Sequence, residues 1–189
     1  MNTKASQFRL RYAAHVLFSG GVVCHPTEGV WGLAALPDDP AAVARILQIK
    51  DRNPEKGVLL VADSIARIAP LLEALPDERR RQVMDSWPGP VTWVLPEPKN
   101  IPVWVRGRHN SVAVRVSDHP LTVALCQAAD SYLVSTSANP AGKAAAKTQR
   151  QAAAYFGDRV DYYVPGRTGG RDRPSEIRDA LSGAILRPA

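Results

Sequence analysis

The clearest pattern along the chain is the strict alternation of apolar and polar positions in residues 111–116, which predicts a β-strand. In SVAVRV the three valines fall on one face and Ser111, Ala113 and Arg115 on the other, because successive strand side chains point to opposite faces. A face made only of valine is typical of a strand that packs into a core. Arg115 would then lie opposite that core, on a strand near the centre of a sheet.

Short apolar runs and helical segments interleave along the rest of the chain. We predict further strands at 22–24, 57–62, 91–95, 132–136, 160–164 and 184–187. We predict helices over 6–19, 40–49, 64–75 and 77–86, and two more that are capped by Asp118 and Thr148 and run to about 129 and to Gly157. Not every connection is a βαβ unit. We therefore expect a single α/β domain over residues 1–189, with a mixed open sheet and flanking helices.

Composition fits a globular protein without membrane or secretion signals. The 189 residues are 45% hydrophobic and 22% charged, which argues against disorder. No apolar run approaches the roughly 20 residues of a membrane span, and charges interrupt the apolar part of the N-terminus, unlike a signal peptide. Cys24 and Cys126 lack CxxC spacing, so we favour buried free thiols over a disulfide or a redox role. We expect a soluble, cytoplasmic protein.

The charge distribution favours an anionic partner. The formal net charge is +6, and no acidic residue occurs between Asp130 and Asp158, where Lys143, Lys147 and Arg150 do. A positive field of this kind attracts nucleotides, RNA or both. Aromatic residues are only 6% of the chain, so a platform for base stacking is not evident.

A row of neutral hydrogen-bonding groups follows the predicted strand 132–136. Ser135, Ser137 and Asn139 are two residues apart and share a face if the chain stays extended. Open α/β sheets bind ligands at the C-terminal ends of strands, and the tight turn ANPAG can expose backbone N–H groups to an anion. Alternatively, these side chains only satisfy backbone groups in a turn.

Two cations after the predicted helix 40–49 supply the charge that this row lacks. Pro54 disfavours helix at Asn53, so we expect an extended chain from which Lys50 and Arg52 project together. Lysine is a compact charge, and arginine is a planar fork that matches phosphate or carboxylate. The alternative is that both only complement a helix dipole. A buried Arg115 likewise needs an anionic partner, either a protein carboxylate or a ligand.

Common motifs for phosphate, metal and nucleophile chemistry are absent from the sequence. It contains no GxxxxGK[ST], GxGxxG, HExxH, CxxC or GxSxG, and its four histidines are scattered. Phosphate chemistry in this chain must therefore rely on charge and hydrogen bonds. In the turn HPTEG, Thr27 is a better ligand candidate than His25, because it lies in the turn itself.

Taken as a set, eight segments resemble the YrdC/TsaC family of threonylcarbamoyl-AMP synthases, in its short bacterial form. They span nearly the whole chain: 25–28 (HPTE), 50–52 (KxR), 87–92 (WPGPVT), 111–116 (SVAVRV), 118–121 (DHPL), 133–139 (LVSTSAN), 165–170 (PGxxGG) and 174–179 (PSEIRD). The resemblance implies a twisted YrdC-like sheet with a basic concave face. It also implies a nucleotidyltransferase that makes L-threonylcarbamoyladenylate and pyrophosphate from L-threonine, bicarbonate and ATP, for t6A modification at position 37 of tRNA. Partner proteins would then transfer the threonylcarbamoyl group.

The resemblance further implies roles for individual residues. Lys50 and Arg52 match the Lys-x-Arg signature and are the expected catalytic residues. The other motif matches assign Arg52, Lys56, Ser111, Ser137, Asn139 and Arg187 to ATP, and Thr27, Arg115, Ser135 and Ser175 to threonine. The assignment of Lys56 departs from the family pattern, because NPEKG replaces the Asn-Pro-Leu of many relatives. Mg²⁺ should accompany ATP, coordinated largely by phosphates and water rather than by protein ligands.

Two other functions remain alternatives. The first is a non-catalytic protein that binds double-stranded RNA or tRNA through a basic face. The second is a phosphosugar enzyme on a related fold, which would need acidic residues around a divalent metal, a pattern not seen in the sequence.

Overall fold

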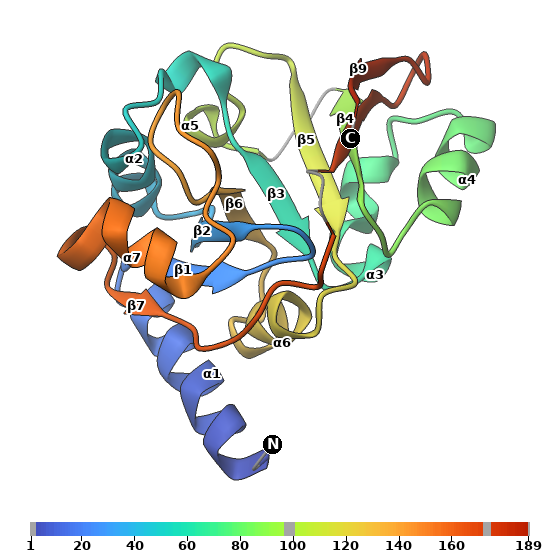
Figure 1. The fold of residues 1–189 in the computed structure, drawn as a ribbon. Helices are drawn as coiled ribbons and strands as arrows, with labels where there is room; N and C mark the ends of the chain where they lie inside the picture. Colours follow the sequence, from blue (N-terminus) through green and yellow to red (C-terminus); the bar gives the residue numbers. More distant parts are fainter. Residues whose placement is uncertain (1–2, 97–100, 172–174, 189) are drawn as a thin grey trace.

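The computed structural model describes residues 3–96, 101–171 and 175–188, and within them the strands form one nine-stranded sheet (Figure 1). The strands are β1 (Val23–Pro26), β2 (Trp31–Ala35), β3 (Leu59–Ala62), β4 (Val91–Pro96), β5 (Ser111–Val116), β6 (Leu133–Ser137), β7 (Tyr162–Tyr163), β8 (Glu176–Asp179) and β9 (Ile185–Arg187). Their order is β7-β1-β2-β6-β3-β5-β4-β8-β9. Parallel pairs (β1–β7, β3–β5, β4–β8) occur beside antiparallel ones, which confirms the predicted mixed sheet. Pro174, the first residue of the PSEIRD motif, lies outside the described residues.

Two of the three predicted N-caps, Asp39 and Thr148, are confirmed. The helices are α1 (Thr3–Phe18), α2 (Pro40–Ile49), α3 (Ile65–Ile68), α4 (Asp77–Asp85), α5 (Val103–Arg106), α6 (Pro120–Ala128) and α7 (Gln149–Phe156). Asp39 accepts a hydrogen bond from the backbone N–H of Ala42, and Thr148 accepts one from Gln151. Both are N-cap contacts that satisfy a helix N–H without an intrahelical partner.

Two predictions about helices were wrong. The segment 64–75 is not one helix, because α3 ends at Ile68 and Ala69–Leu72 is a 3₁₀ turn that contains Pro70. Pro70 has no backbone N–H, so it cannot donate the α-helical hydrogen bond to the carbonyl of Ala66, which accepts from Ala69 instead. Asp118 does not cap α6 either: His119 occupies the N-cap without a side-chain contact, and the Asp118 carboxylate binds Arg171 at 3.0 Å.

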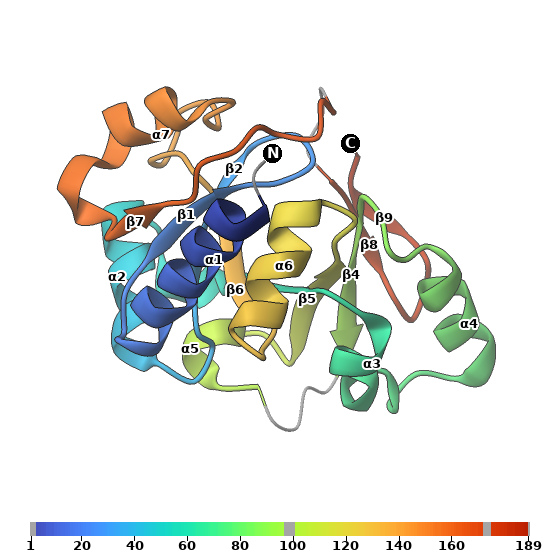
Figure 2. The same ribbon diagram turned by 90° about the horizontal axis from the view of Figure 1, so that it is seen from below.

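One face of the sheet is covered by α1 and α6, which lie side by side beneath it (Figure 2). Val23, Ala34, Val61 and Leu133 pack there against Leu17 of α1 and Leu125, Cys126 and Ala129 at α6. The alternate strand residues, including Leu33, Leu60 and Val114, face the other way into a larger core with Val43 and Ile46 of α2. Alternation along the strands thus builds a core on both faces.

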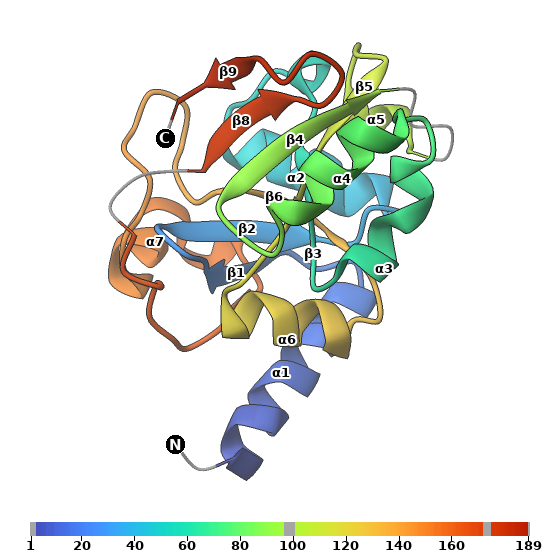
Figure 3. The same cartoon turned by 90° about the vertical axis from the view of Figure 1, so that its right-hand side faces the viewer.

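The N-terminal part of α1 extends beyond the sheet (Figures 1 and 3). Of four apolar residues near helical spacing in α1, Val16 and Leu17 are buried, whereas Phe8 and Tyr12 are 64% and 46% exposed. Tyr12 contacts Tyr162 edge to face, with ring centroids 5.0 Å apart. Helical spacing predicts which side chains share a face, but not how far along the helix the core reaches.

The face under α1 and α6 changes from apolar to polar along β6. Leu133 packs against α6, while Ser135 and Ser137, on the same face, line a cavity to which neither α1 nor α6 contributes a lining residue. On β5, the predicted division is confirmed: the three valines are in the core, and Ser111, Ala113 and Arg115 line the cavity. A single sheet face therefore serves packing at one end and ligand access at the other.

Both cysteines are buried and free, as predicted. Burial raises the pKa of each thiol to about 12, so both stay protonated near neutral pH and are poor nucleophiles. None of the described helices has the length and apolar character that a membrane crossing requires.

We expect Leu133→Ala and Ser135→Ala, on the same face of β6, to affect different properties of the protein, the first its stability and the second its function. Leu133→Ala should lower the free energy of unfolding by about 2–5 kcal/mol, because it removes buried side-chain atoms and leaves a cavity. Ser135→Ala should change it by less than about 1 kcal/mol and instead reduce activity. Urea denaturation and steady-state kinetics on both variants measure this. Equal loss of stability in the two would contradict the division of this face.

Candidate active site

A cavity of about 850 Å³ opens on the polar end of the sheet face. It is lined by strand residues of β2, β3, β4, β5, β6, β8 and β9 and by the loops at 27–30, 52–58 and 139–147. The lining includes every residue that the sequence assigns to ATP or threonine: Thr27, Arg52, Lys56, Ser111, Arg115, Ser135, Ser137, Asn139, Ser175 and Arg187. Segments far apart in sequence therefore meet around one hollow.

The row of hydroxyl and amide groups lies in this cavity, as predicted. The Ser137 hydroxyl donates to Asn139 Oδ1 at 2.6 Å, and Asn139 Nδ2 donates to the carbonyls of Pro140 and Lys143 at 3.1 and 2.8 Å. The backbone N–H of Ala138 donates to the Trp31 carbonyl, which ties the turn to β2. The turn is thus held from both sides, and the Ser137 hydroxyl is exposed to the cavity.

Arg115 has the protein carboxylate that one reading of the sequence required, and it also lines the cavity. Its guanidinium lies 3.1 Å from Glu28 Oε2, and the Ser117 hydroxyl donates to Glu28 Oε1 at 2.5 Å. Burial alone would raise the pKa of Glu28, but Arg115 and Ser117 keep that pKa below its usual value. Among the described residues, Arg115 Nε has no hydrogen-bond partner. A buried, oriented guanidinium with spare donors suits a ligand carboxylate.

Arg52 reaches the cavity through a turn that requires glycine. Its Nε and one terminal nitrogen donate to the Gly57 carbonyl at 3.2 and 2.9 Å. Gly57 has φ = 60°, and a Cβ there would lie 2.7 Å from the Arg106 carbonyl oxygen. Partial burial lowers the pKa of Arg52. Lys56, in the 3₁₀ turn Pro54–Lys56, lines the cavity beside it.

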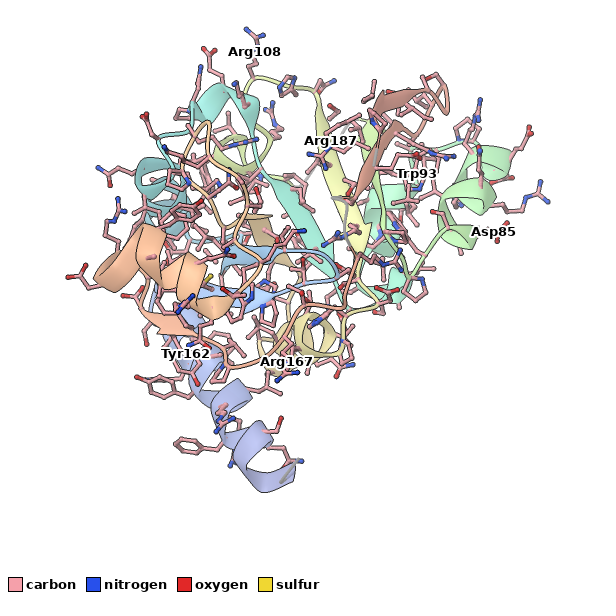
Figure 4. The ribbon with its side chains drawn as sticks, viewed as in Figure 1. Asp85, Trp93, Arg108, Tyr162, Arg167 and Arg187 are labelled. Carbon is pink, nitrogen blue, oxygen red and sulfur yellow. The ribbon has the colours of Figure 1, made fainter. Side chains whose placement is uncertain are left out.

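Arg187 enters from the other side of the cavity. Figure 4 shows its side chain reaching from β9 toward β5, whereas Arg108 points away at the top of the molecule. Arg187 donates to the Ser175 carbonyl at 2.6 Å, and the Ser175 hydroxyl lies 3.1 Å from Thr92 Oγ1. Burial, and then the charge of Arg115, lowers the pKa of Arg187.

The prediction that Lys50 projects together with Arg52 was wrong. Lys50 is only 5% exposed and is not among the residues that line the cavity. Its ammonium donates to the carbonyls of Ser137 and Asn139, the second at 2.6 Å. The cause is local: Lys50 continues the helical turn as the C-cap of α2, whereas the next residue, Asp51, has φ = 51°. The chain reverses there, so the two side chains point differently.

The cavity contains further charged residues that the site prediction missed. They are Glu28, Arg106, Lys147, Arg171 and Asp179, together with His109. Lys147 belongs to the acid-free basic stretch, which is the signal that pointed to it. The two carboxylates are already engaged, Glu28 by Arg115 and Asp179 by the backbone N–H groups of the turn at Leu181 and Ser182. The lining therefore keeps an excess of positive charge, which suits a ligand with several phosphates.

Comparison with known proteins identifies the family. Residues 15–189 match the Sua5/YciO/YrdC family model, described as "Telomere recombination". Proteins named threonylcarbamoyl-AMP synthase are similar over nearly their full length. The one from Marinobacter nauticus is 48% identical over 183 residues, covering 96% of both chains. The one from Pseudomonas aeruginosa strain UCBPP-PA14 is 48% identical over 184 residues, covering 97% of this chain and 99% of its own.

Solved structures agree with this assignment. P. abyssi Sua5 complexed with L-threonine superposes with a TM-score of 0.89 at 29% identity; 96% of this chain and 54% of Sua5 are covered, so this chain spans about half of that protein. E. coli YciO shares the fold, with a TM-score of 0.84 at 20% identity over 96% of this chain and 89% of its own. The chain belongs to the Sua5/YciO/YrdC family.

Proposed function

We infer that this chain is a threonylcarbamoyl-AMP synthase, a nucleotidyltransferase that uses L-threonine, bicarbonate and ATP. Its similarity to full-length synthases supports the activity. The observation that carries the inference at the residue level is the shared cavity, which contains every residue assigned to ATP or threonine. A cavity of about 850 Å³ is large enough for a nucleotide and an amino acid together.

The chemistry needs positioning and charge neutralisation rather than an enzyme nucleophile. The threonine amine and bicarbonate combine to a carbamate with loss of water. A carbamate oxygen then attacks the α-phosphorus of ATP in line, and the bond to the leaving pyrophosphate breaks. Cations that surround the phosphates stabilise the charge on the leaving group. Two reactants bound side by side also react with a large entropic advantage.

The geometry suggests how the residues divide this work. Arg115, oriented by Glu28, is suited to the threonine carboxylate, with the hydroxyls of Thr27, Ser135 and Ser175 nearby in the lining. Arg52, Lys56 and Arg187 supply charge for the triphosphate, and Ser111 supplies a hydrogen bond. Ser137 and Asn139 would donate to ATP after their present hydrogen bonds, to Asn139 Oδ1 and to the carbonyls of Pro140 and Lys143, are exchanged for the ligand. No covalent enzyme intermediate is required.

Mg²⁺ fits this proposal as a companion of ATP. The carboxylates of the lining are occupied by Arg115 and by the β8–β9 turn, and the described residues contain no group of three or more metal-ligating side chains. The ion would be coordinated mainly by phosphate and water oxygens and would neutralise phosphate charge.

The biological role extends this proposal. The adenylate would serve t6A formation at position 37 of tRNA, with partner proteins performing the transfer. The need for ATP and the two free thiols support a cytoplasmic location. A non-catalytic RNA-binding function uses the same positive charge, but it does not account for a small-molecule cavity with a carboxylate-oriented arginine.

The purified protein should form pyrophosphate from ATP only when threonine and bicarbonate are both present. The requirement follows because the carbamate, not water, is the nucleophile. A coupled pyrophosphate assay with each substrate omitted in turn measures this, and mass spectrometry identifies the adenylate. Equal pyrophosphate release without threonine would contradict the proposed function, and salt-dependent tRNA binding without turnover would support the RNA-binding alternative.

Arg52→Ala should reduce kcat/KM for ATP by about 100-fold, because it removes a fixed charge from the phosphate region. The matched control is Arg108→Ala, which removes a charge from an exposed side chain outside the cavity lining. We expect the control to retain activity within about threefold. Thermal unfolding should show both variants folded. Equal loss of activity in the two variants would mean that the overall positive charge of the protein, and not the position of Arg52 in the cavity, determines the rate with ATP.

Arg115→Lys should raise KM for threonine by about 10- to 100-fold and leave KM for ATP nearly unchanged, because lysine cannot make a bidentate contact with a carboxylate. Arg178→Lys is the control, since Arg178 pairs with Glu176 outside the cavity lining. Steady-state kinetics with each substrate varied separates the two constants. An effect confined to ATP would contradict the placement of threonine at Arg115.

A further inference from the structure

Lys50, at the end of α2, makes three connections to a single turn that lies 87 or more residues further along the chain. Its ammonium donates to the carbonyls of Ser137 and Asn139, and its own carbonyl accepts a hydrogen bond from Ala141 N–H at 2.9 Å. Ser137 ends β6 and the other two residues follow it, whereas Lys50 is the C-cap of α2. One residue therefore ties the end of a helix to the turn that carries the hydrogen-bonding groups of the cavity.

The carbonyl oxygens of Ser137 and Asn139, which accept from Lys50, are groups that must not point at a bound anion. A carbonyl oxygen is the negative end of a peptide dipole, so an oxygen directed at a triphosphate would repel it. With both oxygens directed at Lys50, the turn presents the Ser137 hydroxyl, hydrogen-bonded to Asn139 Oδ1, to the cavity. Lys50 itself stays outside the lining.

Stability alone does not account for this lysine. Burial, and then the nearby charge of Arg52, lowers the pKa of Lys50 from 10.5 to about 8, and Cys24 opposes the shift. Because the unfolded chain binds the proton more tightly, the folded protein becomes more stable as pH rises from about 8 to 10.5. Retaining a charged lysine at neutral pH therefore costs stability, which is common for residues retained for function.

We propose that Lys50 is a positioning residue, which acts on ATP through the Ser137–Asn139 turn and not by contact with the nucleotide. The proposal rests on the proposed function, because it assigns this turn to ATP. It replaces the direct catalytic role that the Lys-x-Arg motif suggests for Lys50. The charge that faces the phosphates then comes from Arg52, Lys56 and Arg187, and Lys50 determines the orientation of the turn that carries Ser137.

A double-mutant cycle with Ser137 tests this coupling. Lys50→Met should lower kcat/KM for ATP by about 100-fold, and the double variant Lys50→Met/Ser137→Ala should be no worse than Lys50→Met alone, because the turn has already lost its orientation. Lys143→Met is the matched control: its side chain is exposed on the same turn, and activity should stay within about threefold of wild type. Additive losses in the double variant would overturn the proposal and assign Lys50 a direct contact.

The pH dependence of the unmodified protein provides a second test that does not depend on a variant folding. Kinetic and NMR readouts should share a midpoint near pH 8, where Lys50 loses its proton. Above it, kcat/KM for ATP should fall while the free energy of unfolding does not. The backbone amides of Ala138 and Asn139 should titrate with the same midpoint without any ligand. Amides that titrate with a different midpoint from kcat/KM, or not at all while kcat/KM falls, would overturn the proposal.

The two tests also separate this proposal from the proposed function. A wild-type protein without threonine-dependent pyrophosphate release would refute the synthase activity, yet the ligand-free amide titration would still report whether Lys50 orients the turn. If the wild type is active and the losses in kcat/KM of Lys50→Met and Ser137→Ala add up in the double variant, only the role of Lys50 is refuted.

Discussion

Backbone carbonyl oxygens orient Arg52 and Arg187 in the cavity lining and Lys50 beside it, and the function depends on this arrangement. Arg52 donates to Gly57, Arg187 to Ser175, and Lys50 to Ser137 and Asn139. A carbonyl directs a cation without neutralising it, so the positive charge remains for an anionic ligand. A carboxylate partner would cancel much of that charge. Clustering these charges without counter-ions costs folding energy, which the two hydrophobic clusters of the sheet must offset.

Arg171 and Arg115 pair with carboxylates instead, and the pairing of Arg115 fits a different task. Glu28 neutralises it and, with Ser117, fixes its orientation in a nearly dry environment. A neutralised but oriented guanidinium suits one carboxylate, whose recognition depends on geometry, whereas a triphosphate requires a surplus of charge. The two halves of the cavity therefore differ in electrostatics in the way that an amino acid and a nucleotide differ. This difference is what distinguishes a synthase cavity from a general basic surface for RNA.

The sheet explains how such a cavity coexists with a stable core. Helices α1 and α6 cover only part of one face, and β6 changes from Leu133 to Ser135 at the edge of that cover. The other face is apolar throughout β5. The fold occurs in proteins of different length: the chain matches nearly all of the synthases it resembles and superposes on about half of P. abyssi Sua5.

Sequence alone determined the features that depend on neighbouring residues. The alternation in 111–116, the caps at Asp39 and Thr148, and the spacing of Ser135, Ser137 and Asn139 follow from local geometry, and the resemblance of ordered motifs identified the family. Only the tertiary structure decided what each charged side chain contacts. The reversal of the chain at Asp51 sends Lys50 to a turn 87 residues away and Arg52 into the cavity, and the pairing of Glu28 with Arg115 joins another two distant segments. Hydrogen bonds and ion pairs act over a few ångströms in space, and no spacing along the chain encodes those distances.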